Sequence, residues 1–398
     1  MNHSTHADVR LVLPEGGFVF EVGSLYDRLD GLMDARDARG KRYPLAVVLM
    51  LIMLAKLSGE DRPSGIAEWA RQRQSELIEL LPLTRETLPC ANTYRNVASQ
   101  AVAVEALQQL VTAYLREQPH AGWSVLITID GKTLRGSWSQ EHPAGVHLLA
   151  AYLPAEGLVL MQVAVDQKTN EITAAPRVLK CLDLRGKIVM GDALHTQRAV
   201  SVQIVDSDGN FVWYAKDNQP RLRADIELLF QPEQCGPGSK PVPTTFESAT
   251  QTDKGHGRIE KRTLTTSSLL KDYLDWPHVA QVFKLERQVW DLQMQPLRLE
   301  VVYGLTSLSA AQAGPVRLLE LTRAYWGIEN GLHYRRDVTL REDATRMRNA
   351  RAAQVWATIN NLLVGLLAQL PFANLPQARR FFAAQPLMAV GILTARSL

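Results

Sequence analysis

Three acidic residues of this 398-residue chain stand where their side chains could act together on a phosphodiester bond. Asp130 ends the apolar run ITI, and Asp192 ends a second apolar run, KIVMG. Glu329 follows the apolar residues Trp326 and Ile328 in a segment that reads as a helix. Two acids at strand ends and one on a late helix can meet in space around a divalent metal.

Phosphodiester cleavage or transfer must stabilise charge on both the attacking and the leaving oxygen. Two divalent ions roughly 3.5–4 Å apart do this, and carboxylates bridge them. Mg²⁺ is a hard ion that keeps several waters, so a few carboxylates suffice and no His/Cys cage is needed. We therefore predict that Asp130, Asp192 and Glu329 are catalytic ligands for two Mg²⁺ ions, with Mn²⁺ able to substitute.

Each acid taken alone has a plainer interpretation. Asp130 precedes Gly131, and Asp-Gly is a strong turn signal. Asp192 could cap the segment that begins at Ala193, and Glu329 could lie on a solvated helix face. Their order along the chain, strand, strand and then late helix, favours the metal site.

The surrounding elements change character along the chain. Residues 24–118 show helical patterns, with Pro44 at a helix start, where its missing N–H is harmless. The unbroken apolar run 45–55 is too short for a membrane span, which needs about 20 residues, so we expect a buried helix. From residue 123 onward, five short runs rich in strand-forming residues follow: WSVLITID, VHLLAAYL, GLVLMQVAV, KIVMGDA and FVWYAKD.

Helices are expected at 171–180 and 195–206, between the last three of these runs. Three strands, helix, strand, helix, strand is the order of an RNase H-like sheet. Residues 220–314 do not continue it and read as a β-rich insertion, after which helices return at 315–340 and 350–370. We predict an α/β fold: an RNase H-like mixed sheet with flanking helices, this insertion before the last catalytic helix, and an all-helical N-terminal region.

Composition sets loose bounds on function. The net charge is +3 and the isoelectric point about 8.7, so a nucleic-acid surface must come from local clustering of basic residues. The three cysteines are scattered without zinc-ligand spacing, which fits a reducing cytoplasm, and the polar N-terminus does not read as a signal peptide.

Five segments, in this order, make the chain resemble a DDE transposase of the H-repeat-associated insertion-sequence family. They are DARDARGKRYPLAVVLMLIMLAKLSG, ITIDGKTLRGS, VMGDALHTQ, GHGRIEKR and YWGIENGLHYRRDVTLREDATRMRNARAAQ. The likeness covers roughly residues 24–370. It implies that Asp130, Asp192 and Glu329 are the DDE triad, and it implies double-stranded DNA as partner, namely the element's terminal inverted repeats and target DNA.

Several other residues are candidates for DNA contacts. Lys132 and Arg135 could hold phosphates near the metals, and His195 could contact the scissile phosphate or support a carboxylate. His333 stands four residues after Glu329, and packing against the sheet is preferred there over metal binding. The remaining basic candidates are Arg335, Arg336 and Arg341 after Glu329, and Arg258 and Lys261 on the insertion.

Two further groups are weighed against structural roles. Trp276 and Trp290 lie on the insertion, where related hairpin-forming transposases carry a base-stacking aromatic, although core packing is favoured for both. A helix beginning near Thr93, with Arg95 in its first turn, could read bases in the major groove or simply be structural.

The sequence therefore predicts four segments: an N-terminal DNA-end-recognition domain (1–118), a first part of the catalytic core (119–219), the insertion (220–314) and the remaining core (315–398). The expected function is two-metal cleavage and strand transfer of insertion-sequence ends by a homodimer in the bacterial cytoplasm, associated with the nucleoid. A nuclease with the same triad, or a transposase-derived DNA-binding protein without chemistry, are the alternatives.

Overall fold

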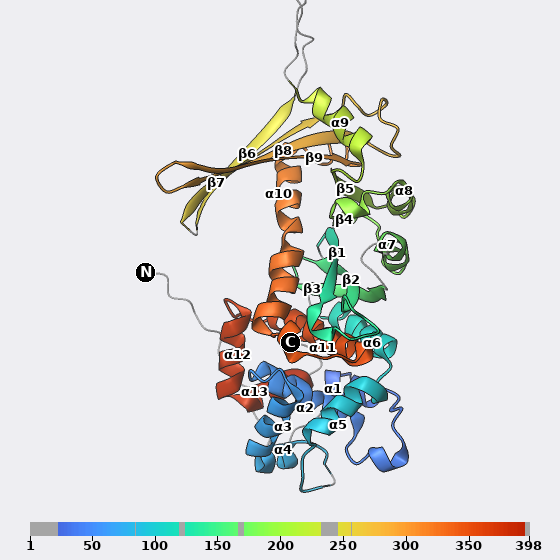
Figure 1. The fold of residues 1–398 in the computed structure, drawn as a ribbon, viewed down its shortest axis with the longest axis vertical. Helices are drawn as coiled ribbons and strands as arrows, with labels where there is room; N and C mark the ends of the chain where they lie inside the picture. The colour runs from blue at the N-terminus through green and yellow to red at the C-terminus, as the bar shows by residue number, and fades with distance from the viewer. Residues whose placement is uncertain are drawn as a thin grey trace, which may run out of the picture.

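The computed structural model describes residues 23–83, 85–118, 124–165, 171–231, 246–255 and 257–394. Figure 1 shows a long molecule with a sheet in its upper half and helices in its lower half. Within these ranges, no helix is both long enough and apolar enough to cross a lipid bilayer.

A central sheet carries the RNase H-like order predicted from the sequence. Its five strands are β1 (Leu126–Leu134), β2 (Val146–Leu153), β3 (Leu158–Val165), β4 (Ile188–Gly191) and β5 (Asn210–Ala215). They lie in the order β3-β2-β1-β4-β5. The first three are antiparallel neighbours, and β4 and β5 run parallel to β1. Helices α7 (Glu171–Lys180) and α8 (Arg198–Asp206) connect the later strands, so the predicted fold class is confirmed.

The insertion extends this sheet instead of forming one of its own. After α9 (Pro220–Leu229) come β6 (Glu247–Gly255), β7 (Arg258–Ser267), β8 (Gln281–Asp291) and β9 (Pro296–Thr306). Strand β9 pairs with β5 in antiparallel fashion, and the order continues β9-β8-β7-β6. The nine strands thus form one sheet, with β6–β9 at the top of Figure 1.

The helical N-terminal region is built around one wholly buried helix. Among the residues that the structure describes, the region comprises six α-helices: α1 (Leu25–Asp30), α2 (Leu45–Leu57), α3 (Pro63–Gln72), α4 (Gln74–Leu80), α5 (Ala91–Asn96) and α6 (Val104–Arg116). All thirteen residues of α2 are buried, which confirms the expected buried helix and explains its unbroken apolar run. The helix expected from residue 93 begins at Ala91, and a π-helical turn (Val97–Ala101) and a break at Val102 separate it from α6.

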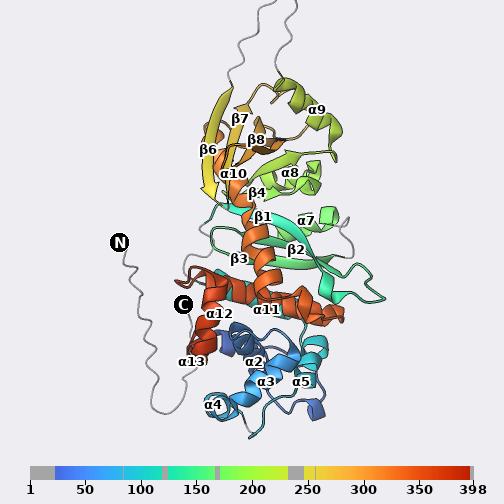
Figure 2. The ribbon, with the colours of Figure 1, turned by 60° about the vertical axis from the view of Figure 1, so that its left-hand side comes forward.

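The C-terminal helices tie these two halves together. They are α10 (Pro315–Tyr325), α11 (Ala350–Ala368), α12 (Leu375–Ala384) and α13 (Pro386–Thr394). Figure 2 shows α11 lying between the sheet and the N-terminal helices. One apolar cluster joins α2, α3 and α6 to α11, α12 and α13, and it includes Leu158 of β3. The hydrophobic core therefore crosses the expected boundary at residue 118.

Candidate active site

Asp130 and Asp192 lie side by side because their strands are parallel neighbours. Ile129 of β1 pairs with Gly191 of β4, so the next residue on each strand is an aspartate at the same edge. Strand β1 continues past Asp130 to Leu134, paired with β2, so Asp130-Gly131 is not a turn. Asp192 does cap the short 3₁₀ turn that follows it, accepting a hydrogen bond from the Leu194 N–H at 2.9 Å.

Glu329 reaches the same place from the far end of the chain. The expected helix stops being an α-helix at Tyr325 and continues as π-helical turns, Ile328–His333 and Arg335–Thr339. Such turns occur mostly as single insertions and often at functional sites. In this geometry His333 Nδ1 lies 3.1 Å from Glu329 Oε2 and 3.6 Å from Asp130 Oδ2.

These side chains offer a compact donor set. One ligand atom from each of Asp130, Glu329 and His333 lies within 4.8 Å of the other two. Two carboxylate oxygens suit a hard divalent ion such as Mg²⁺ or Mn²⁺ when waters complete its shell, whereas an imidazole nitrogen is a softer ligand. Asp192 is not a member of this tight set, although it lies beside Asp130 on the next strand. His333 is buried, as expected of a residue that packs against the sheet, and the same position makes it a candidate ligand.

The electrostatics of the site favour a bound cation. The pKa of the Asp130 carboxyl is raised to about 6, mainly by burial and also by the neighbouring Asp192, while His333 acts in the opposite direction. The hydrogen bond with His333 instead lowers the pKa of Glu329. A half-buried acid pressed against another acid is the arrangement that a positive ion relieves.

A largely buried group of polar residues lies next to Asp192. Its members are Thr133, His147, Glu171 and His195. Oε1 of Glu171 lies 2.7 Å from Nε2 of His147, and Oε2 lies 3.2 Å from Nε2 of His195. The His147 ring also contacts the Thr133 hydroxyl at 2.8 Å. His195 Nε2 is 3.9 Å from Asp192 Oδ1, so the ring lies near that carboxylate.

Glu171 and His147 were missed by the sequence reasoning. Glu171 opens α7 and is 1% exposed, and the two imidazoles lower its pKa to about 2 although burial opposes this. A Cβ at position 131 would collide with both the Glu171 carboxylate and the His147 ring. A glycine at position 131 therefore allows the Glu171 carboxylate and the His147 ring to approach the backbone next to Asp130. The Asp-Gly pair in the sequence was the one visible sign of this close packing.

The basic candidates near the acids fall into two groups. Lys132 is 8% exposed and forms an ion pair with Asp337, so its ammonium is engaged within the protein. Arg336 is 0% exposed and is held by Glu342 at 2.8 Å, and it also donates to Gln162. Both therefore join β1 and β3 to the segment after Glu329. Arg335 is half-buried, whereas Arg135 and Arg341 are exposed.

The candidates farther from the acids are also spread over different settings. Trp276 is 7% exposed and donates its indole N–H to Ser201, which fits a core residue, and Trp290 is half-buried in β8. Arg258 and Lys261 are exposed on β7. Thr93 is half-buried inside α5, and Arg95 is exposed on the same helix. None of these residues belongs to the cluster of acids.

Known proteins match most of this chain. A protein named "H repeat-associated putative transposase YhhI", from Escherichia coli K12, is 25% identical over 87% of this chain and 91% of its own length. The E. coli K12 protein YbfL is 26% identical with the same coverage. A protein from the dhlA 3′ region of Xanthobacter autotrophicus is 33% identical over 63% of this chain and 83% of its own.

Family models agree with these relatives. Residues 26–115 match the DDE_Tnp_1-associated domain, and residues 124–366 match the transposase DDE domain. The second match covers the sheet, the insertion and the segment that carries Glu329. The chain is therefore a member of the transposase DDE family.

Proposed function

We propose that this protein is a divalent-metal-dependent transposase that cuts the ends of its own element and joins them to target DNA. The observation that carries the proposal is the meeting of Asp130, Glu329 and His333 within 4.8 Å, beside Asp192. Three chain segments contribute to it: Asp192 lies 62 residues after Asp130, and Glu329 lies 137 residues after Asp192.

Each residue has a definite part in this proposal. Asp130, Asp192 and Glu329 are the metal-binding acids, and His333 holds Glu329 and completes the donor set. The Gly131 N–H donates to Asp130 Oδ1 at 2.9 Å and fixes the orientation of that carboxylate. Two divalent ions, when bound, would stabilise charge on the attacking and leaving oxygens of the phosphodiester.

Double-stranded DNA is the proposed substrate, and a homodimer would hold two element ends together in the nucleoid. The exposed residues Arg135 and Arg341, with the half-buried Arg335, would contact phosphates, and Arg258 and Lys261 would do so from the insertion. The exposed Arg95 on α5 would contribute to end recognition. The buried Lys132 and Arg336 would position the segment after Glu329.

The test is a cleavage and joining assay. The DNA carries the sequences that flank the gene, the target is a supercoiled plasmid, and Mg²⁺ or EDTA is present. We expect Mg²⁺-dependent cuts that leave 3′-hydroxyls, followed by joined products. Asp192→Asn should abolish both steps, whereas Glu320→Gln, an exposed α10 acid, should change neither. Cutting without joining would favour a nuclease, and binding without either step would favour a DNA-binding regulator.

A further inference from the structure

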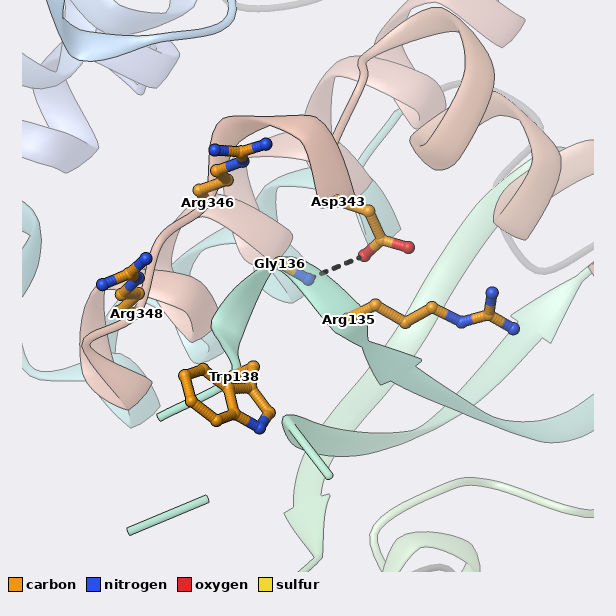
Figure 3. Close-up of a pocket in the computed structure, with 6 residues that line it drawn as sticks. All are labelled: Arg135, Gly136, Trp138, Asp343, Arg346 and Arg348. Atoms are coloured by element: carbon orange, nitrogen blue, oxygen red, sulfur yellow. Dashed lines mark hydrogen bonds between the residues drawn. The ribbon is translucent and has the colours of Figure 1, made fainter. Parts of the chain in front are cut away.

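A hollow of about 240 Å³ lies where the end of the Asp130 strand meets the segment that follows Glu329. Six residues line it, as Figure 3 shows: Arg135, Gly136, Trp138, Asp343, Arg346 and Arg348. Arg346, Arg348 and the Trp138 ring lie on one side of Gly136, and the Arg135 side chain extends on the other.

The hollow has a defined framework. Residues Arg135–Ser137 form a 3₁₀ turn directly after β1, and Asp343–Thr345 form another. The Gly136 N–H donates to Asp343 at 3.4 Å, and a Cβ on Gly136 would collide with the Asp343 backbone. Arg341 and Arg346 bracket the second turn with left-handed backbone, at φ 49° and 54°. Non-glycine residues hold that conformation only where the surroundings impose it.

Three arginine side chains around this hollow have no acidic partner in the described part of the chain. Arg135, Arg346 and Arg348 form no ion pair or side-chain hydrogen bond with any residue in the described ranges. By contrast, Arg336 and Arg379 are fully engaged with buried acids. Asp343 is the one carboxylate among the six lining residues, and its oxygen faces the Gly136 N–H. Guanidinium groups without protein partners are suited to bind phosphate oxygens, often in bidentate fashion.

Trp138 adds an aromatic surface to these cations. It is 53% exposed, in contrast to the buried Trp276 of the insertion. A tryptophan ring beside a phosphate-binding group is the combination that proteins use for unpaired nucleotides, because every base can stack on it. A fully paired duplex keeps its bases stacked inside, so it would use the arginines but not the indole.

We propose that this hollow binds one unpaired nucleotide of the DNA, with its base on Trp138 and its phosphates on Arg346 and Arg348. The inference rests on the proposed DNA-processing function and adds a site to it. Because Trp138 follows Asp130 by eight residues on the same strand and turn, a nucleotide held here would fix the DNA strand relative to the metal-binding acids.

The experiment compares two labelled duplexes that differ by a single unpaired thymidine. The full chain is titrated onto each by fluorescence anisotropy in EDTA, at several salt concentrations. We expect tighter binding of the bulged duplex, and we expect Trp138→Ala to lose at least about fivefold of that preference, which is about 1 kcal/mol. Trp138→Phe should retain most of the preference, since its ring still stacks.

The arginines give a second, independent readout. Arg346→Gln with Arg348→Gln should weaken both duplexes and reduce the slope of log affinity against log salt by roughly 0.9 per lost contact. Arg221→Gln, an exposed α9 arginine, and Tyr273→Ala, an exposed aromatic, are matched controls that should change nothing. Thermal unfolding of each variant confirms that the fold is intact.

The outcomes separate the two proposals. Three outcomes overturn the nucleotide site alone. The wild-type protein binds both duplexes equally, Trp138→Ala retains the preference for the bulged duplex, or Trp138→Phe loses as much of that preference as Trp138→Ala does. An unchanged salt slope in the double arginine variant also overturns it. Failure to bind either duplex overturns the DNA-processing function as well.

Discussion

Nδ1 of His333 lies 3.6 Å from Oδ2 of Asp130, although 203 positions separate the two residues in the chain. The contact exists because the π-helical turn after α10 packs against β1, an interior strand of the sheet. The same nitrogen lies 3.1 Å from Glu329, so His333 bridges two of the predicted catalytic acids.

The first prediction concerns the buried charge of Asp130. Its pKa of about 6 lies above the value of about 3.9 for an unfolded chain, so ionisation destabilises the metal-free fold as pH rises between these values. Asp130→Asn should therefore stabilise the metal-free protein by up to about 3 kcal/mol at pH 8 and by little below pH 4. Urea unfolding in EDTA at both pH values measures this difference.

The same variant should cleave DNA more than roughly 100-fold more slowly while still binding it. Loss of a residue that only supports a metal ligand costs up to about 100-fold, and loss of a direct ligand should cost more. Glu320→Gln is the control. Glu342→Gln would be a poor one, because Glu342 is buried against Arg336 and Asn360. Wild-type cleavage by Asp130→Asn would contradict the metal assignment.

The second prediction assigns His333 to the metal site. His333→Gln removes a nitrogen ligand and the contact that orients Glu329, so half-maximal cleavage should require at least about tenfold more Mg²⁺. Calorimetric titration with Mn²⁺ in the absence of DNA should show the same loss of affinity. His142→Gln, on an exposed loop, should leave both values unchanged. Unchanged affinity in His333→Gln would mean that this histidine only packs against the sheet.

The third prediction concerns Glu171. Because its pKa is lowered to about 2, its charged form stabilises the fold above pH 4.5, and that stabilisation is lost as pH falls towards 2. Glu171→Gln should cost about 3 kcal/mol at pH 7, and the gap to wild type should narrow below pH 4.5. Urea unfolding across this range tests it, with the exposed Glu141→Gln as control. A gap independent of pH would show that the charge of Glu171 is not the source.

The fourth prediction separates neighbouring arginines. Arg336→Ala leaves the buried Glu342 without its cation, so it should destabilise the fold by about 3–5 kcal/mol. Arg335→Gln with Arg341→Gln should leave stability nearly unchanged. That pair should instead reduce the slope of log affinity against log salt by roughly 0.9 per phosphate contact. An unchanged slope would assign these two arginines to the fold.

The fifth prediction concerns DNA-end recognition by α5. Deleting the N-terminal helices would not test this role cleanly. Helices α2, α3 and α6 share one core with α11–α13, so a fragment that starts near residue 122 would lose part of the core as well. Arg95→Gln is a sharper change, since this side chain is exposed and, among the residues that the structure describes, donates only to the nearby Asn92. We expect a weaker footprint on element ends and little change on unrelated DNA. Equal weakening on both would make Arg95 a phosphate contact.

The sequence by itself determined the order of strands and helices. Long apolar runs must lie in the interior of the protein. Accordingly, β2 is buried along its whole length and α2 is buried on every face. The sequence also indicated that Asp130 and Asp192 could meet, and their strands are parallel neighbours. The expectation that the first strand ends at Asp130 was wrong, because β1 continues to Leu134 in its pairing with β2. The family motif then pointed to Glu329 as their partner.

Only the tertiary structure decided which charged side chains form ion pairs inside the protein. Lys132 and Arg336 read as surface cations, yet Asp337 and Glu342 engage them. Hydrophobic periodicity does not predict such pairs. Lys132 and Asp337 lie 205 residues apart, and Arg336 and Glu342, although only six residues apart, pair inside the protein and not on its surface. The change from α-helical to π-helical turns after Tyr325 is equally invisible in sequence. His333, at the end of the first of these turns, lies 3.1 Å from Glu329 and 3.6 Å from Asp130.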